Sequence, residues 1–182
     1  RELKADVLIG TKVRLTGEDM GGIGAAIARS AEGSLRRMGR EAVDLIQLHN
    51  HLGWQRRVDK NLVSLEDLDA AIRAFESLHR QGKVRAWGIT GMGPSEALQE
   101  AVGKGGFQTI QLPYNLLNQS AGASPPAGFP FQDYGQLIDR SAEREMGVIA
   151  IRILAGGALS GATERHPVAA KSRFPSTCSR HR

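Results

Sequence analysis

The stretch LEDLDAAIRAFESLHRQGKVRAWGIT, residues 65–90, changes its hydrophobic period part-way along. In its first half, apolar side chains recur every three or four positions, as they do on the buried side of an α-helix, at Leu65, Leu68, Ile72, Phe75 and Leu78. Ser64 precedes this half as a suitable N-cap, and Gly82 follows it where a glycine commonly ends a helix. Residues 84–90 are mostly apolar with little polar alternation, which is typical of a strand buried in a parallel sheet. The stretch therefore predicts a helix followed by a buried strand.

The same two patterns recur on both sides of this stretch. Strand-like runs are expected at residues 6–13, 43–48, 84–90, 109–114 and 148–154. Further helices are expected at 23–38 before Gly39, from Pro94 in a first turn to Gly103, and from about 134 to 146. This alternation predicts an α/β fold with a parallel sheet, either doubly wound or closed into a barrel. No G-x-G-x-x-G follows any of these runs, which weighs against a dinucleotide-binding Rossmann site.

Composition and charge narrow the classes of function. The chain has 182 residues, one cysteine and a net charge of +5, and the basic segment from residue 163 onward carries most of that charge. The rest is nearly neutral, so the charge does not indicate nucleic-acid binding. No apolar run approaches the roughly 20 residues of a membrane span. We expect a cytoplasmic protein with a globular part at 1–161 and a basic, disordered or foreign tail at 162–182.

Polar side chains are expected where the buried strands end, which is where α/β enzymes place their functional groups. Lys12, His49 and Thr90 end successive runs, while Gln111 and Arg152 lie within later ones. Each has a simpler structural interpretation, since a lysine at a strand end usually extends into solvent and a single histidine is more often structural. A charge within an apolar run is stranger, because burial of an unpaired charge is costly. The spacing of His, Asp, Glu and Cys gives no sign of a metal site.

The order of these segments resembles the aldo/keto reductase family over roughly residues 6–161. The matching stretches are LIGTKV (8–13), SLRRMGREAVDLIQLHN (34–50), the opening stretch (65–90), TIQLPYNLLN (109–118) and MGVIAIRILAGGALSG (146–161). The resemblance implies a (β/α)8 TIM barrel, incomplete here, with about five of its eight strands recognisable. It also implies an oxidoreductase that reduces aldehydes or ketones with NADPH.

The resemblance assigns roles to individual residues. Lys12 and His49 match the lysine and histidine of the family's catalytic Asp, Tyr, Lys and His. Lys12 would lower the pKa of the acidic tyrosine, and His49 would orient the carbonyl. Thr90 and Gln111 match positions that hold the nicotinamide carboxamide, and Ile151, Arg152 and Leu154 belong to the strand and loop beside the cofactor. Three positions depart from the usual family residues, namely Gly91, Ile151 and Arg152.

The resemblance also indicates what the matched stretch does not contain. The family's first two strands, which carry the catalytic Asp and Tyr, and its eighth strand have no counterpart here. The chain begins with an arginine at a strand-like segment, so we expect a partial chain that is inactive alone. The alternative is a truncated, non-catalytic barrel that acts as a binding or regulatory module. The long segment 118–133, rich in Pro, Gly, Ser and Ala, is expected to shape an active site. Neither the carbonyl substrate nor the oligomeric state is predicted.

Overall fold

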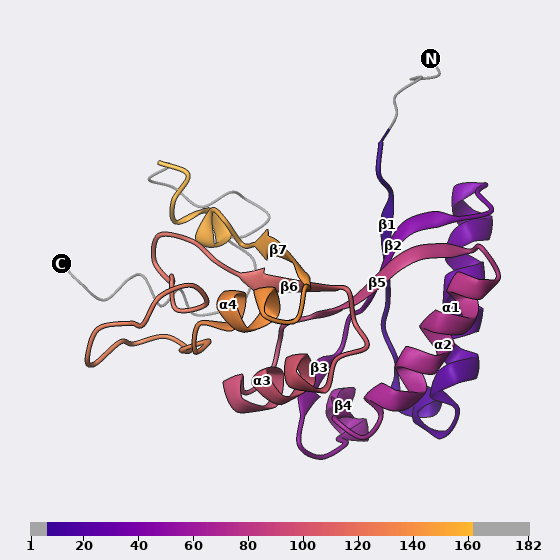
Figure 1. Ribbon diagram of the computed structural model, residues 1–182, viewed down its shortest axis with the longest axis horizontal. Helices are drawn as coiled ribbons and strands as arrows, with labels where there is room; N and C mark the ends of the chain where they lie inside the picture. The colour runs from indigo at the N-terminus through magenta and orange to yellow at the C-terminus, as the bar shows by residue number, and fades with distance from the viewer. Residues whose placement is uncertain (1–6, 162–182) are drawn as a thin grey trace.

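A single curved sheet organises the residues that the computed structural model describes, which are 7–161 (Figure 1). Its five parallel strands follow the order β1-β2-β5-β6-β7. Their bounds are β1 Gly10–Val13, β2 Val43–Leu48, β5 Val84–Thr90, β6 Thr109–Pro113 and β7 Gly147–Ile151. Each strand thus pairs with the next one along the chain, apart from a separate two-stranded sheet between β2 and β5.

The strand order decides between the two architectures that the sequence left open. A doubly wound sheet reverses its strand order at a switch point, and its helices cover both faces. Here the order never reverses, and successive parallel strands step in one direction across the sheet. This is the winding of a (β/α)8 barrel, of which five strands are present in residues 7–161.

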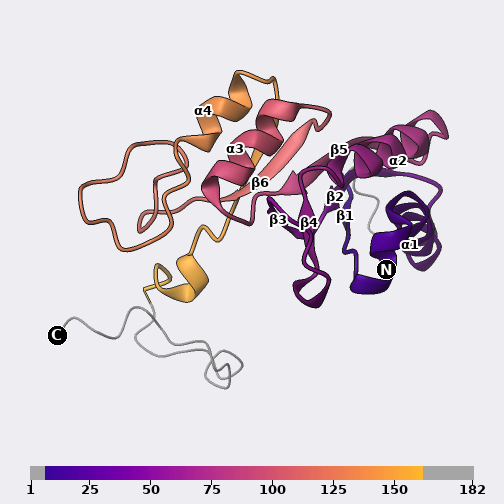
Figure 2. The same cartoon turned by 90° about the horizontal axis from the view of Figure 1, so that it is seen from below.

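Four helices cover one side of the sheet, which we call the outer face. They are α1 Ile23–Met38, α2 Leu68–Arg80, α3 Ser95–Lys104 and α4 Leu137–Ala142. Figure 2 shows them following one another around the sheet. The strand side chains that join their core are Ile46, Leu48, Trp87, Ile89, Ile110 and Leu112. The Trp87 indole N–H donates to the carbonyl oxygen of Gly106 at 2.7 Å, so even this polar group is satisfied within the core.

The helix ends follow the predicted signals with small changes. Gly39 and Gly82 have φ of 61° and 71°, the left-handed conformation that glycine adopts without strain. α2 begins at Leu68 with Asp67 as its N-cap, so the N-cap predicted at Ser64 was wrong; Ser64 and Asp67 instead exchange backbone-to-side-chain hydrogen bonds of 3.0 and 3.3 Å in the turn before the helix. Pro94 is the N-cap of α3 rather than a residue of its first turn, because its ψ of 139° is extended.

Other predicted boundaries were wrong. β7 ends at Ile151 rather than at residue 154, and α4 covers only part of 134–146. α3 continues to Lys104, one residue past the predicted glycine. The predicted tail, 162–182, lies outside the described residues.

A small parallel sheet that the sequence did not predict follows β2. It pairs β3 His51–Gly53 with β4 Leu62–Ser64. A charged cluster holds it in place, since Arg56 donates to the Asp67 carboxylate at 3.0 Å and to the Met20 carbonyl at 2.9 Å. Burial alone would raise the pKa of Asp67, but hydrogen bonds from Arg56 and Ser64 outweigh burial and hold the pKa below its ordinary value of 3.8.

Candidate active site

The face of the sheet away from the helices, which we call the inner face, carries polar side chains in two rows. In the lower row, Lys12 pairs with Gln47, Gln47 with Gly88, and Gly88 with Thr109 across four strands. In the upper row, Thr90 pairs with Gln111. Partners in a parallel ladder point to the same side of a sheet, so the residues of each row share the inner face. The sequence had singled out Lys12, Thr90 and Gln111 but neither Gln47 nor Thr109.

His49 joins the upper row just beyond the end of β2. Its backbone N–H donates to the Val13 carbonyl at 2.7 Å, which continues the β1–β2 pairing, and its Nδ1 lies 3.2 Å from the Thr90 hydroxyl. Burial lowers the pKa of His49 below its ordinary value of 6.5, and the positive charge of Lys12 lowers it further. His49 is therefore a neutral imidazole at pH 7, with one ring nitrogen hydrogen-bonded to Thr90.

Lys12 lies on β1, next to His49 in space. Its side chain is exposed on the inner face. Within residues 7–161 its ammonium group makes no hydrogen bond and no ion pair. The site thus contains a cation without a partner beside a neutral histidine.

Thr90 and Gln111, the two residues expected from the sequence to hold the nicotinamide carboxamide, lie next to each other in the upper row. Thr90 is buried and its hydroxyl contacts the His49 ring. The Gln111 Oε1 is buried and accepts no hydrogen bond from any described residue. A buried acceptor without a donor is costly, and it fits a ligand group that carries N–H donors, such as a carboxamide.

The other three predicted cofactor residues lie at the far end of the sheet. Ile151 ends β7 and its carbonyl accepts from the Tyr114 N–H at 3.1 Å. The prediction that Arg152 lies within this strand was wrong, because Arg152 has a φ of 57° and is exposed in the following turn. The guanidinium group of Arg152 is exposed to solvent, so no buried partner is needed for its charge. Leu154 is also exposed, as the N-cap of a short 3-10 helix, Ala155–Gly157.

The two tyrosines of the chain lie away from the Lys12–His49 pair. Tyr114 packs beside Gly122 and against the helix-covered core. Tyr134 is buried, and burial raises its pKa above the ordinary value. A tyrosine that gives up its proton in catalysis needs the opposite shift, so Tyr134 is not suited to act as the acid, and Tyr114 is packed against the core.

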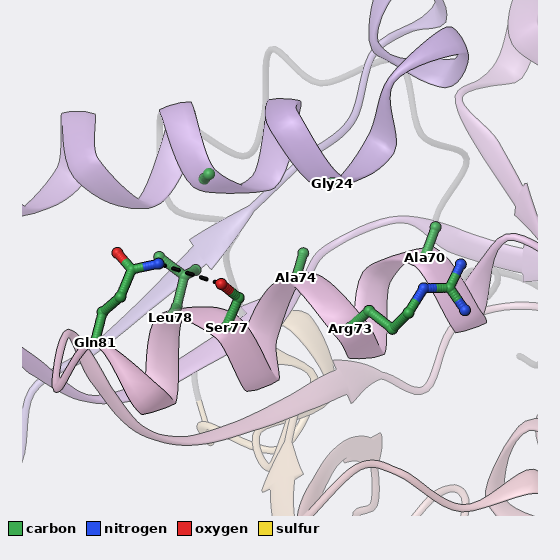
Figure 3. Close-up of a pocket in the computed structure, with 8 residues that line it drawn as sticks. Gly24, Ala70, Arg73, Ala74, Ser77, Leu78 and Gln81 are labelled. Carbon is green, nitrogen blue, oxygen red and sulfur yellow. Dashed lines mark hydrogen bonds between the residues drawn. The ribbon is translucent and has the colours of Figure 1, made fainter.

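Two hollows of the surface contain none of the predicted site residues. One, of about 400 Å³, is a groove between α1 and α2 lined mainly by small side chains, with Arg73 and Gln81 at its rim (Figure 3). The other, of about 470 Å³, lies within the long segment after β6 and is lined by Pro125, Pro126, Phe129 and neighbouring residues. Within residues 7–161 no cluster of His, Cys, Asp and Glu is arranged to hold a metal ion, and no helix is long and apolar enough to cross a membrane.

Comparison with known proteins agrees with this geometry. The model of the aldo/keto reductase family matches residues 1–177. The chain belongs to the aldo/keto reductase family. An aldo-keto reductase of Babesia bovis is 29% identical, over 86% of this chain and 59% of that protein.

Two solved aldo-keto reductases show the same fold. AKR11C1 of Bacillus halodurans in its holo form superposes with a TM-score of 0.61 at 23% identity, over 89% of this chain and 47% of that one. An enzyme of Klebsiella pneumoniae in complex with NADP and acetate gives 0.56 at 22% identity, over 85% of this chain and 46% of that one. The chain thus spans less than half of these structures and about three-fifths of the Babesia bovis relative.

Proposed function

We propose that this aldo/keto reductase chain supplies the lysine, the histidine and part of the cofactor site of an NADPH-dependent reductase of small aldehydes or ketones. The observation that carries the proposal is the neutral His49 on the inner face, between the unpaired Lys12 ammonium and the Thr90–Gln111 pair. The complex of the Klebsiella pneumoniae relative with NADP supports the choice of cofactor. We place this activity in the cytoplasm.

His49 orients the carbonyl through its ring nitrogens. The Thr90 hydroxyl lies 3.2 Å from Nδ1 and is able to donate to it. In that arrangement the imidazole proton is on Nε2, which then donates to the oxygen of a bound carbonyl. The lowered pKa of His49 keeps the ring neutral, so it acts as a hydrogen-bond donor with one fixed tautomer rather than as a cation.

Lys12 acts through its charge. An ammonium group near a phenol favours the phenolate, and so it lowers the pKa of a general acid brought next to it. It also stabilises negative charge that develops on the carbonyl oxygen. Both effects need the ammonium on the inner face, where the register with Gln47 places Lys12.

Gln111 and Thr90 are the residues that would hold the cofactor. The orphaned Gln111 Oε1 would accept from a carboxamide N–H, and the neighbouring Thr90 backbone would border the ring. When bound, NADPH would supply the hydride that reduces the carbonyl carbon.

The 182-residue chain should not turn over aldehydes by itself, because neither tyrosine is placed as the acid. We would follow the loss of NADPH absorbance with an aldehyde substrate, using the chain alone and the chain extended by the Asp- and Tyr-bearing strands of a family member. The extended protein should be active, and Lys12→Met or His49→Ala should lower its kcat by about a hundredfold or more.

A matched control is Lys60→Met, which changes an exposed lysine outside the inner-face rows and should leave turnover near that of the parent. Ready turnover by the chain alone, or full activity of both site variants, would sink the assignment. Binding of NADPH by the extended protein without any turnover would favour a non-catalytic binding module instead.

A further inference from the structure

Arg14, which the sequence did not single out, follows β1 at the edge of the candidate site. His49 follows β2 in the same way, and its N–H continues the β1–β2 pairing at the Val13 carbonyl. The residues on both sides of Arg14, Val13 and Leu15, are 0% and 1% exposed and belong to the core under the helices. Side chains alternate along an extended backbone, so Arg14 is directed to the inner face, as Lys12 is.

The backbone around Arg14 is held by a buried asparagine. Asn50 is 2% exposed, and its Oδ1 accepts a hydrogen bond from the Leu15 N–H at 2.9 Å. Its Nδ2 donates to the Leu15 carbonyl oxygen at 2.8 Å and to the Asn61 carbonyl oxygen at 2.8 Å. Both backbone groups of the residue after Arg14 are thus bonded to one side chain next to His49, which fixes the point from which the arginine side chain extends.

The charge of Arg14 is not neutralised within residues 7–161. Its guanidinium group is exposed and makes no hydrogen bond and no ion pair there, and the same holds for the Lys12 ammonium. Burial is the largest cause of the lowered pKa of His49, and the charges of Lys12 and Arg14 lower it further, with no described acidic side chain acting in the opposite direction. Two cations therefore lie on the β1 side of His49 without a counter-charge.

The order of the strands separates this charge from the residues expected to hold the cofactor. Arg14 follows β1, His49 follows β2, and Thr90 and Gln111 lie on β5 and β6. In the proposed function the nicotinamide lies by Thr90 and Gln111 and the carbonyl oxygen is held by His49. The part of the substrate that points away from the cofactor then extends toward Arg14.

The chemistry of the arginine side chain names the group that it would bind. A guanidinium group holds a carboxylate through two parallel hydrogen bonds, which a lysine ammonium does not match. We propose that Arg14 binds a carboxylate of the substrate, and that the preferred substrates are short aldehydes or ketones with a carboxylate a few carbons from the carbonyl. The inference rests on the proposed function for the place of the carbonyl, whereas carboxylate binding by Arg14 needs neither cofactor nor turnover.

The first test compares succinic semialdehyde with its methyl ester, which is the same aldehyde without the carboxylate charge. The kcat/KM of the extended protein should be at least about tenfold higher for the acid than for the ester. Arg14→Gln should remove most of this preference by raising the KM for the acid about tenfold, and it should leave kcat/KM for the ester within about twofold. Arg14→Lys keeps the charge without the planar fork and should retain part of the preference. Arg80→Gln, at an exposed arginine that ends α2, is the matched control and should change neither value.

A second measurement separates this inference from the proposed function. Succinate, added to the 182-residue chain without cofactor, should shift the His49 ring resonances in the NMR spectrum of the parent and of Arg80→Gln. Arg14→Gln should bind succinate at least about fivefold more weakly. The same acid-to-ester preference in the parent and in Arg14→Gln would overturn the inference and leave the proposed function standing. If the extended protein reduces neither aldehyde, the proposed function is wrong and succinate binding decides alone: equal affinity in the parent and in Arg14→Gln would then overturn the inference as well.

Discussion

The two faces of the curved sheet differ in how completely their side chains are satisfied. On the outer face, strand residues such as Ile46, Ile89 and Ile110 are fully buried under the helices, and the Trp87 indole has its acceptor. Within residues 7–161, Lys12 on the inner face makes no hydrogen bond or ion pair, and the buried amide oxygens of Gln47 and Gln111 accept no hydrogen bond. The outer face thus packs into an apolar core, whereas the inner face keeps polar groups without hydrogen-bond partners among the described residues. A ligand or a mobile side chain can form hydrogen bonds with these groups.

The contrast shows which face stability depends on. Burial of apolar area stabilises a fold roughly in proportion to the area removed from water, and here that area lies between the outer face and the helices. Polar groups on the inner face add little to stability and, where unpaired, subtract from it. Substitutions of apolar residues on the outer face should therefore lower stability, whereas substitutions of polar residues on the inner face should mainly weaken binding.

The largest effect is expected from Phe75→Ala, in the helix layer over the outer face. Phe75 is fully buried on α2, and its truncation leaves a cavity that the surrounding core fills only in part. The free energy of unfolding should fall by about 3–5 kcal/mol, as measured by urea denaturation. Leu116→Ala, at a leucine that is mostly exposed, should change it by less than about 0.5 kcal/mol. Similar losses in the two variants would contradict a core confined to the outer side.

The next largest effect is expected from Gly88→Ala, in the sheet itself. The new Cβ would lie 2.2 Å from the Thr109 carbonyl oxygen, so β5 and β6 must shift apart and the 3.1 Å hydrogen bond from the Gln47 Nε2 to the Thr109 hydroxyl is lost. We expect a loss of about 1–3 kcal/mol in the same denaturation experiment. Gly24→Ala in α1 is the matched control, since its Cβ meets nothing within 4 Å, and it should stabilise the protein by about 0.5–1 kcal/mol. An unchanged free energy of unfolding in Gly88→Ala would show that the inner face has room for a side chain at this position.

Arg56→Gln tests a polar cluster that is satisfied, in contrast to the inner face. The loss of the Asp67 partner should cost about 1–2 kcal/mol at pH 7, where solvent screening of the partly exposed Arg56 limits the effect. The pKa of Asp67 is lowered in the folded state, so this stabilisation is complete above the ordinary carboxyl value of 3.8 and is lost as the pH falls through the lower folded pKa.

The matched control for this cluster is the adjacent arginine. Arg57→Gln breaks an exposed ion pair with Asp59. It should leave the free energy of unfolding unchanged both at pH 7 and below the ordinary carboxyl pKa. Parent and Arg56→Gln should therefore converge in urea midpoint as the pH falls below the ordinary carboxyl value. A difference that stays constant with pH would show that Arg56 stabilises the fold through packing and the Met20 carbonyl rather than through Asp67.

The smallest effect on stability is expected from Gln111→Leu, on the inner face. Replacing a half-buried amide whose oxygen is orphaned with an apolar side chain should change the free energy of unfolding by less than about 1 kcal/mol, in the stabilising direction. In the extended protein the same substitution should weaken NADPH binding at least about tenfold, measured by calorimetry. Gln81→Leu, at an exposed amide after α2 on the helix-covered side, is the control for binding. Clear destabilisation by Gln111→Leu would mean that its amide has a partner within the fold.

The sequence predicted the outer face better than the inner one. The helical repeat of 3.6 residues and the apolar runs of buried strands are both read from apolar residues alone. Leu68, Phe75 and Ile89 lie in the core as expected. Strand order was not readable, because a parallel sheet produces the same local pattern in a barrel and in a doubly wound fold. β3 and β4 were missed because each has three residues, too few for any period to appear.

For the candidate site, sequence reasoning found the residues at strand ends but not the contacts between them. Lys12, His49 and Thr90 lie on the inner face, where strand-end reasoning places them, and Gln111, predicted within its strand, lies beside Thr90. Their roles stay predictions. Arg152 was misplaced because the apolar residues on both sides of it continue the strand pattern into a turn. Gln47 was missed because its significance depends on Gly88 and Thr109, which are distant in sequence and meet it only through the register.

The packing of Trp87 against the helix layer makes its fluorescence a reporter of the core. The two tryptophans of the chain lie in opposite surroundings, because Trp87 is buried while Trp54, in the β3–β4 connection, is 57% exposed. Emission from Trp87 should be blue-shifted and shielded from a dissolved quencher such as acrylamide, whereas emission from Trp54 should be red-shifted and readily quenched. The intrinsic fluorescence of the unlabelled chain therefore resolves into two signals, one that follows the core of the outer face and one that follows the β3–β4 connection.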